Sequence, residues 1–425
     1  MKKSRYANIV HKGNDYLIHH SLFGGIVRAS CDNSRSFLDM IESESSFGID
    51  EDEKFHQDLL EMRMIVEDDV IESNLANFYL SKNPNELFII MFVTKQCNFR
   101  CVYCCQTHED KKMSDKTYDD MLKAIEGLID ANRYKVVRVS FFGGEPLLEY
   151  DAVCRFSERL VELAERKDVT YIGGMTTNGY LLTPERLKRL VELKVTEYQI
   201  TVDGLKETHD KARVLLGDGS PWETIMENLI SAKSSDIPFR FMVRTNFDDE
   251  IVQNATEFVE YLSQNFKGDS RFMYHFESVK NLDGATDIDF NLVADEASCM
   301  NEISLSAKKA DLRVSSSETV IRPLGLACYA TSNDSFSIDY DGTIMKCTVH
   351  VDMPKNRIGH ISDEGITLDD YMMSNWTSFG LSEKCKSCKI LPICFNKKCP
   401  LVGADDNACD RFTTMYENAG HVLNQ

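Results

Sequence analysis

From residue 87 onward, short runs of β-forming residues alternate with amphipathic stretches of helical spacing. This alternation predicts an α/β fold, a parallel sheet with helices on its outer face, because parallel strands need long crossover connections. Six such units suit a partial (β/α)6 barrel of the TIM type, whose chemistry takes place at the carboxyl ends of the strands. The predicted strands are 87–93, 136–142, 170–177, 197–202, 239–245 and 271–276, and the predicted helices are 114–131, 151–166, 183–193, 221–233 and 250–266.

Composition and charge narrow the class of protein. The chain has 425 residues, 43% of them hydrophobic, and a formal net charge of −20. The hydrophobic content excludes a disordered chain, and the acidic charge argues against nucleic acid and anionic membranes as partners. The N-terminus lacks the apolar run of a signal peptide, and the longest apolar run, 87–93, is too short to cross a bilayer. We therefore expect a cytoplasmic protein without a membrane segment.

The 14 cysteines are distributed unevenly, with one group within 97–105 and another within 328–409. Thiols stay reduced in the cytoplasm, where clustered cysteines usually bind metal or take part in catalysis. Three cysteines lie singly in amphipathic stretches and are expected to pack in the protein interior: Cys31, Cys154 and Cys299.

The first predicted strand runs into Cys97, Cys101 and Cys104, spaced C-x3-C-x2-C with an aromatic residue before the third cysteine. Three thiolates can hold three irons of a [4Fe–4S] cluster and leave the fourth iron open. Cys105 does not fit this spacing, because a motif that started at Cys101 and included Cys105 would need a third cysteine at the position of His108. We therefore expect the Cys105 thiol to pack against its neighbours rather than to bind the cluster. A zinc site completed by His108 is the alternative.

A second motif, Gly143-Gly144-Glu145-Pro146, follows the second predicted strand. Glycines let a ligand approach the backbone closely, and the carboxylate is a hydrogen-bond acceptor. Together with the cysteine spacing, this motif resembles the signature of the radical S-adenosylmethionine (SAM) superfamily.

The resemblance implies a partial barrel in which Cys97, Cys101 and Cys104 hold the cluster and the open iron chelates the amino and carboxylate groups of SAM. One-electron reduction would then cleave SAM to methionine and a 5′-deoxyadenosyl radical that abstracts hydrogen from the substrate. The same resemblance assigns Gly143, Gly144 and Glu145 to the amino end of SAM.

Further stretches resemble those that line the SAM pocket in relatives. They include Thr177 and Asn178 after the third strand, Asp203 after the fourth, and Arg213 in the next loop. Arg213 is the predicted partner of the SAM carboxylate, because a guanidinium binds a carboxylate through two hydrogen bonds. An ordinary turn without a role in SAM binding is an equally open alternative for these stretches, since Asn-Gly and Asp-Gly are common turn dipeptides.

The tail carries seven cysteines that resemble the SPASM domain of radical SAM enzymes, with one departure: four residues instead of three separate Cys394 from Cys399. The resemblance implies two auxiliary [4Fe–4S] clusters, and so three clusters in all. Zinc bound by four of these thiolates is the alternative. The resemblance assigns Cys328, Cys347 and Cys399 to a proximal cluster and Cys385, Cys388, Cys394 and Cys409 to a distal one.

Two roles at the proximal cluster have no assigned residue. Its fourth ligand would be an unidentified residue or a substrate thiolate. Some relatives carry an Asp directly after the cysteine at the Cys347 position, where it acts as a base, but this chain has Thr348 and we assign no general base.

Residues 1–80 form a predicted winged-helix-like α+β unit. A hairpin (16–20 and 26–28, around Gly24-Gly25), two amphipathic helices and a wing strand within 64–71 make up this unit. It resembles the element with which radical SAM maturases bind the leader of a ribosomally made peptide. In that mode of binding, the leader adds as a further strand to the edge of a sheet. The predicted domains are therefore 1–80 for leader recognition, 87–280 for the barrel, 281–325 as linker with a helix at 295–311, and 326–425 as the SPASM domain.

The leading functional prediction is an enzyme that installs a cross-link in a precursor peptide, with a thioether from a substrate Cys as the preferred product. Carbon–carbon cross-linking, epimerisation, decarboxylation and formylglycine formation are alternatives, and a non-enzymatic zinc or iron–sulfur adaptor is the alternative from a different class. The predicted partners are a precursor peptide with its leader and an electron donor such as flavodoxin or ferredoxin, with no nucleic acid and no membrane.

Overall fold

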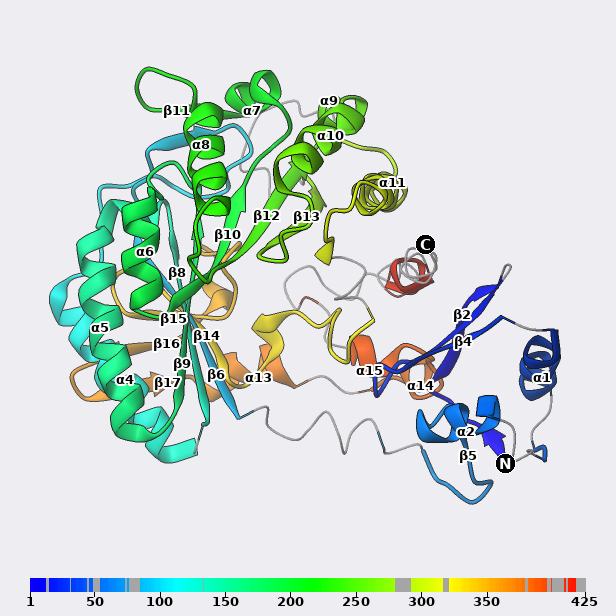
Figure 1. Cartoon of the computed structure of the whole chain (residues 1–425). Helices are drawn as coiled ribbons and strands as arrows, with labels where there is room; N and C mark the ends of the chain where they lie inside the picture. The colour runs from blue at the N-terminus through cyan, green and yellow to red at the C-terminus, as the bar shows by residue number, and fades with distance from the viewer. Residues whose placement is uncertain are drawn as a thin grey trace. The chain divides into compact units, whose positions relative to one another are not determined.

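The computed structural model groups the chain into two compact units, each described here by itself (Figure 1). Unit 1 comprises Met1–Pro84, Ser315–Thr331 and Ser378–Gln425, and unit 2 comprises Asn85–Val314 and Ser332–Thr377. Cys31 and two stretches of the predicted linker, 281–291 and 316–320, lie outside the described residues. The structure describes residues 1–12, 15–30, 32–43, 46–48, 54–72, 75, 85–132, 134–279, 292–315, 321–378, 381–395, 399, 409 and 412–417.

Unit 2 is built on a ten-stranded sheet of order β13-β12-β10-β9-β8-β6-β14-β15-β16-β17. Its first six strands are parallel and adjacent in chain order, which confirms the predicted partial barrel. These six are β6 (Glu86–Thr94), β8 (Val136–Gly143), β9 (Thr170–Thr177), β10 (Val195–Thr201), β12 (Arg240–Phe247) and β13 (Phe272–Ser278).

Four strands from the predicted SPASM region extend this sheet. The strand β14 (Ser335–Ile338) pairs in parallel with β6, and antiparallel hairpins add β15 (Thr343–Met345), β16 (Arg357–Ser362) and β17 (Gly365–Leu368). The sequence boundary at residue 326 therefore differs from the structural grouping, because this pairing joins segments more than 200 residues apart.

Helices follow the parallel strands, and α4, α5, α6 and α8 lie along one side of the sheet (Figure 1). Side chains cap several of them, such as Thr183 before α6 and Ser220 before α8. None of the described helices is both long and apolar enough to span a membrane. The helices are α4 (Asp115–Asn132), α5 (Tyr150–Lys167), α6 (Pro184–Glu192), α7 (Lys206–Ala212), α8 (Pro221–Lys233), α9 (Asp249–Gln253), α10 (Ala255–Phe266), α11 (Glu296–Lys309) and α13 (Asp370–Thr377).

The predicted helix 250–266 is two helices in the structure. Asn254 lies between α9 and α10 with a non-helical backbone (φ −104°, ψ 11°). Its side chain donates to the Glu250 carbonyl over 3.0 Å, so it competes with the helical backbone pattern there.

Unit 1 contains the predicted hairpin. Strands β3 (Tyr16–His20) and β4 (Ile26–Ala29) are antiparallel, and β2 (Ala7–Lys12), which the sequence did not predict, pairs with β3 on its other side. The predicted wing is short, since only β5 (Ile65–Val66) pairs there, with β1 (Lys2–Lys3). The helices α1 (Asp32–Ser43) and α2 (Lys54–Glu61) pack apolar side chains such as Leu38 and Leu59 against this sheet.

The C-terminal segment shares a core with the N-terminal sheet. Leu17 packs with Ile393 and Tyr416, and the Tyr416 hydroxyl lies 2.7 Å from Nδ1 of the buried His19. The short helices α14 (Glu383–Lys386) and α15 (Leu391–Cys394) therefore belong to unit 1 rather than to the barrel. The predicted domain 1–80 lies within unit 1, whereas residues of the predicted domain 326–425 are divided between the two units. The apolar contacts that group them are long-range and leave no local pattern in the sequence.

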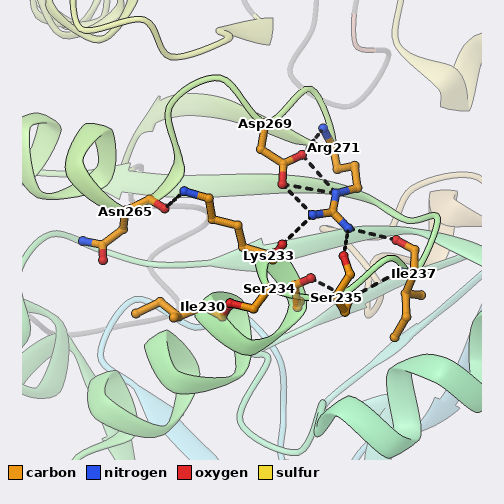
Figure 2. Close-up of polar contacts among 9 residues, drawn as sticks. Ile230, Lys233, Ser234, Ser235, Ile237, Asn265, Asp269 and Arg271 are labelled. Carbon is orange, nitrogen blue, oxygen red and sulfur yellow. Dashed lines mark hydrogen bonds and ion pairs between the residues drawn. The ribbon is translucent and has the colours of Figure 1, made fainter.

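The Arg271 side chain connects the end of α8 with the start of β13 through hydrogen bonds, as Figure 2 shows. Its guanidinium donates to the carbonyl oxygens of Ser235 (2.6 Å), Ile237 (3.1 Å) and Lys233 (2.7 Å). Asp269 accepts from Arg271 Nε at 3.0 Å and so orients the guanidinium. The last carbonyls of a helix have no partner within the helix. Arg271 satisfies the carbonyl of Lys233, the last residue of α8, and two carbonyls of the loop that follows.

We predict that Arg271→Ala lowers the free energy of unfolding of unit 2 by about 2 kcal/mol or more, because several charge-assisted hydrogen bonds are lost together. Guanidinium denaturation of the full chain measures this change. Arg166→Ala is the matched control, since Arg166 is 55% exposed and pairs only at the surface, where a change under about 0.5 kcal/mol is expected. Equal effects of the two substitutions would contradict this role for Arg271.

Candidate functional site

The three cysteines of the first motif lie in one loop that leaves β6. This loop contains β7 (Phe99–Cys101), which pairs antiparallel with β11 (Arg213–Leu215) and places Cys101 opposite Arg213. The Phe99 amide donates to the Cys97 sulfur at 3.3 Å, and the Cys104 amide donates to the Cys101 carbonyl at 3.0 Å. Backbone pairing therefore fixes the loop at the carboxyl end of β6, where the fold class places chemistry.

The three thiols are close enough to influence one another's ionisation. Burial, with smaller contributions from Glu145, Cys101 and Cys104, raises the pKa of Cys97 to about 12, and the hydrogen bond from the Phe99 amide acts in the opposite direction. Burial also raises the pKa of Cys101 and of Cys104. Free thiols would thus stay protonated, and a bound metal would have to displace their protons.

The donor set suits more than one group. Each thiolate of a [4Fe–4S] cluster binds a different iron, whereas zinc needs its donors to converge on one ion. Cys97, Cys101 and Cys104 as ligands of a [4Fe–4S] cluster therefore stay a prediction, with zinc as the alternative.

The Gly-Gly-Glu turn after β8 is bonded directly to the cysteine loop. The Gly144 amide donates to the Thr94 carbonyl at 2.9 Å, and the Glu145 amide donates to the Gln96 carbonyl at 2.8 Å. A Cβ at position 143 would lie 2.2 Å from the Thr94 oxygen, and one at 144 would lie 2.0 Å from the Gln96 oxygen. The two glycines are therefore needed for this approach of one backbone to another.

The Glu145 carboxylate joins three strand ends. It is fully buried and accepts hydrogen bonds from the Leu147 amide (2.9 Å), the Thr177 hydroxyl (2.8 Å) and the Asn178 amide (2.7 Å). The Asn178 side chain donates in turn to Asn98 of the cysteine loop at 2.7 Å. Burial raises the pKa of Glu145, and these hydrogen bonds act in the opposite direction. The carboxylate therefore positions these strand ends, and its predicted contact with the amino end of SAM stays a prediction.

Tyr103, the aromatic residue of the cysteine motif, links two other predicted site residues. Its hydroxyl donates to the Asp203 carboxylate and accepts from Arg213 Nη1 at 2.7 Å. Asp203 also accepts from the Asn246 amide at 2.7 Å, and its carboxylate lies 3.6 Å from the Arg213 guanidinium. This buried network joins the cysteine loop to the ends of β10 and β12.

Arg213 retains one unused donor. Its Nε is buried without a hydrogen-bond partner among the described residues, and its charge lies near enough to Cys101 to favour the thiolate form of that cysteine. A buried donor without a partner is costly, so this atom fits an anionic group bound beside the cysteine loop. The observation is compatible with the predicted binding of the SAM carboxylate, which stays a prediction.

Sequence reasoning missed three residues that hold this site together. Tyr103 was noted only as an aromatic residue of the motif, and the roles of Asn98 and Asn246 were not predicted. Asn246 directly follows the predicted strand 239–245, so its position at a strand end was an available signal. Asn98 lies between two motif cysteines and offered no signal of its own.

The tail cysteines are divided between the two units. In unit 1, burial raises the pKa of Cys388, and the Cys385 and Cys409 thiols act in the same direction, which indicates that these three lie near one another. Cys394, the fourth predicted distal ligand, is buried at the end of α15. Cys347 follows β15 in unit 2, whereas Cys328 and Cys399 belong to unit 1, so a shared proximal cluster stays a prediction.

We predict that Gly144→Ala abolishes the cluster of the first motif, because the new Cβ would overlap the Gln96 carbonyl oxygen. Anaerobic reconstitution followed by iron and sulfide analysis should give about four irons fewer per chain than the wild type.

Gly127→Ala is the matched control for this substitution. Gly127 lies in α4 with nothing within 4 Å of an added Cβ, and Ala favours a helix. Its iron content should equal that of the wild type. Full iron content in Gly144→Ala would show that the turn does not shape the cysteine loop.

Comparison with known proteins agrees with this geometry. The model of the Radical SAM superfamily matches residues 91–259. The chain is 32% identical over 120 residues to the tungsten-containing aldehyde ferredoxin oxidoreductase cofactor-modifying protein of Pyrococcus furiosus, covering 28% of this chain and 31% of that protein. It is 24% identical to the cysteine-type anaerobic sulfatase-maturating enzyme of Clostridium perfringens, covering 73% of this chain and 88% of that enzyme.

Coverage of the relatives is mostly partial. The chain spans about a third of the length of many curated relatives that it matches. Among solved structures, Streptococcus suis SuiB has a TM-score of 0.52 at 15% identity, covering 94% of this chain and 98% of SuiB, which shows a shared fold. SuiB has also been solved bound to its precursor peptide SuiA.

The matched region contains the cysteine loop and the Gly-Gly-Glu turn, both at the carboxyl ends of parallel strands, and Arg213 in β11, which pairs with the cysteine loop. Residues 91–259 therefore form a domain of the radical SAM superfamily, whose members are SAM-dependent enzymes.

Proposed function

We propose that this chain is a radical SAM enzyme that modifies a ribosomally made precursor peptide. The observation that carries the radical chemistry is the loop of three thiols bonded through its backbone to the Gly-Gly-Glu turn. Cys97, Cys101 and Cys104 would hold a [4Fe–4S] cluster, and a bound SAM would supply a 5′-deoxyadenosyl radical.

The chain's own residues would orient SAM and exclude water. The backbone of Gly143 and Gly144 borders the cysteine loop, where the amino end of SAM is expected. The unused Nε of Arg213 would donate to the SAM carboxylate. Asp203 and Tyr103 keep the guanidinium oriented, and Glu145 holds Thr177 and Asn178 in place beside the expected amino end of SAM.

The N-terminal sheet supports a peptide as the substrate. In the described sheet β3 lies between β2 and β4, so β4 is an edge with unpaired backbone groups. Ile26 on this strand is 38% exposed, which offers an apolar contact beside the edge. An extended leader could add there as a further strand. The precursor peptide bound to SuiB and the protein substrate implied by the name of the sulfatase-maturating enzyme support the same substrate class.

A thioether between a substrate Cys and an unactivated carbon is the product that we propose. Such a C–H bond has no acidity for a base to exploit, which suits hydrogen abstraction by a radical. The cross-link removes two hydrogens: one leaves as an atom to the 5′-deoxyadenosyl radical, and the thiol hydrogen leaves as a proton and an electron. Auxiliary clusters would accept that electron, and a flavodoxin or ferredoxin would reduce the first cluster.

Formylglycine formation is the second candidate. The long match to the sulfatase-maturating enzyme favours it, whereas Thr348, in place of the Asp that acts as a base in some relatives, argues against it. Thioether formation stays the preferred reaction for this reason.

We predict that the anaerobically reconstituted chain converts SAM to 5′-deoxyadenosine when dithionite is added, as measured by liquid chromatography and mass spectrometry. The Cys97→Ala/Cys101→Ala/Cys104→Ala variant should lower this rate by at least about a hundredfold, because no iron remains to bind and reduce SAM. Cys299→Ser, in α11 outside both motifs, should keep the wild-type rate. If the iron-loaded wild-type chain formed no 5′-deoxyadenosine, the proposed radical SAM activity would be refuted.

We predict a product that has lost two hydrogens when a Cys-containing peptide encoded beside this gene is coexpressed with the enzyme. Tandem mass spectrometry would locate the bond, and replacing the substrate Cys by Ser should abolish the mass change. Exchange of sulfur for oxygen together with the loss of two hydrogens would identify formylglycine instead, and an unchanged mass would refute oxidative cross-linking.

A further inference from the structure

The side chains of β12 alternate between buried and partly buried along the strand. The buried set includes Phe241, which packs on Phe272, and Phe272 packs in turn on Phe266 of the helix α10. Arg244 and Asn246 alternate with the buried set, because successive side chains of a strand point to opposite faces. They therefore lie on the face of the sheet that turns away from α10, which we call the inner face.

Two arginines near the amino end of the inner face are neutralised by carboxylates. Arg138 on β8 donates from Nε to Glu86 at 2.9 Å and from Nη1 to Glu197 on β10. Arg240, at the start of β12, also pairs with Glu197. Each of these two cations thus has a counter-charge within the sheet.

Arg244 differs from these two arginines. It lies four residues beyond Arg240, about 13 Å closer to the carboxyl end of the strand. Its Nε donates to Asn246 Oδ1 at 2.8 Å. Within the part of the chain that the structure describes, Arg244 forms no ion pair with a carboxylate, and its two Nη atoms donate no hydrogen bond. A partly buried cation without a counter-charge is unfavourable, so this edge of the guanidinium fits an anionic group.

Polar side chains of the neighbouring strands flank Arg244. In the register of the sheet it lies between Thr201 of β10 and His275 of β13. Glu277, the carboxylate next along β13 on the same face, is paired with His275, whose Nε2 lies 3.6 Å from it. Thr201 and His275 offer further hydrogen-bonding groups to a ligand of the guanidinium.

Asn246 connects Arg244 to the predicted SAM site. Its Nδ2 donates to the Tyr103 hydroxyl at 3.2 Å, and that hydroxyl accepts from Arg213, the predicted partner of the SAM carboxylate. Asp203, the carboxylate that the charge of Arg244 influences, is already bonded to Tyr103 and Asn246. With Arg213 assigned to SAM, Arg244 stays available for the molecule that reacts beside SAM.

We propose that Arg244 binds a carboxylate of the substrate peptide close to the residue that loses hydrogen. A guanidinium binds a carboxylate through two parallel hydrogen bonds, here from the two Nη atoms that have no partner in the described residues. The carboxylate belongs either to an Asp or Glu side chain or to the C-terminus of the peptide. This inference rests on the proposed function, which takes a peptide to be the substrate.

This role makes Arg244 a specificity-determining residue. An uncharged amide in place of the carboxylate would leave the guanidinium without a counter-charge. We therefore expect a neutral analogue to bind more weakly by at least about tenfold.

The test measures binding rather than turnover. The anaerobically reconstituted full chain is first saturated with SAM, so that Arg213 is occupied, and is then titrated with small probes in a calorimeter. N-acetyl-Glu-N-methylamide carries only a side-chain carboxylate, N-acetyl-Ala carries only a C-terminal carboxylate, and N-acetyl-Gln-N-methylamide is the neutral analogue. One of the two charged probes should bind at least about tenfold more tightly than the neutral one, and its identity shows the source of the carboxylate.

Arg244→Gln should abolish this preference and leave the affinity for SAM unchanged. Arg244→Lys, which keeps the charge and loses the planar fork, should retain part of the preference, so a folding defect in one variant would not obscure the result. Arg240→Gln is the matched control on the same strand and face, and it should keep the full preference, because Arg240 is already paired with Glu197.

Two outcomes would overturn this inference alone: SAM-bound wild type that does not distinguish the charged probes from the neutral one, and an undiminished preference in Arg244→Gln. A lower affinity for SAM in Arg244→Gln would also overturn it, since Arg244 would then belong to the SAM site. A wild-type chain that binds no SAM would instead refute the proposed function.

Discussion

The direct backbone contact between the Gly-Gly-Glu turn and the cysteine loop is the constraint on which the site depends. Two amide hydrogen bonds join the ends of β6 and β8, and a Cβ at Gly144 would come within 2.0 Å of the Gln96 oxygen. Glu145 carries the same constraint to β9 through Thr177 and Asn178. Because its carboxylate is buried, losing any of these partners would leave a polar group unsatisfied, so three strand ends are fixed as one unit.

Two buried charged side chains, Arg213 and Asp203, adjoin the cysteine loop. Arg213 lies opposite Cys101 in the β7–β11 pair, where its guanidinium favours the thiolate form of that cysteine. A buried guanidinium needs a counter-charge, and Asp203 provides it through the Tyr103 hydroxyl. Tyr103 comes from the cysteine loop itself, so the loop that would hold the cluster also holds the cation beside it.

The six parallel strands and the location of the site could be predicted from sequence, because both depend on local patterns. Hydrophobic runs and caps mark the elements, and the Cys and Gly motifs follow predicted strands directly. The break at Asn254 depends on one side chain competing with a helix. The addition of β14 to β6, the Leu17–Ile393 contact and the approach of Cys105 to Val349 are long-range. The hydrophobic pattern within one segment does not indicate which distant segment it will contact.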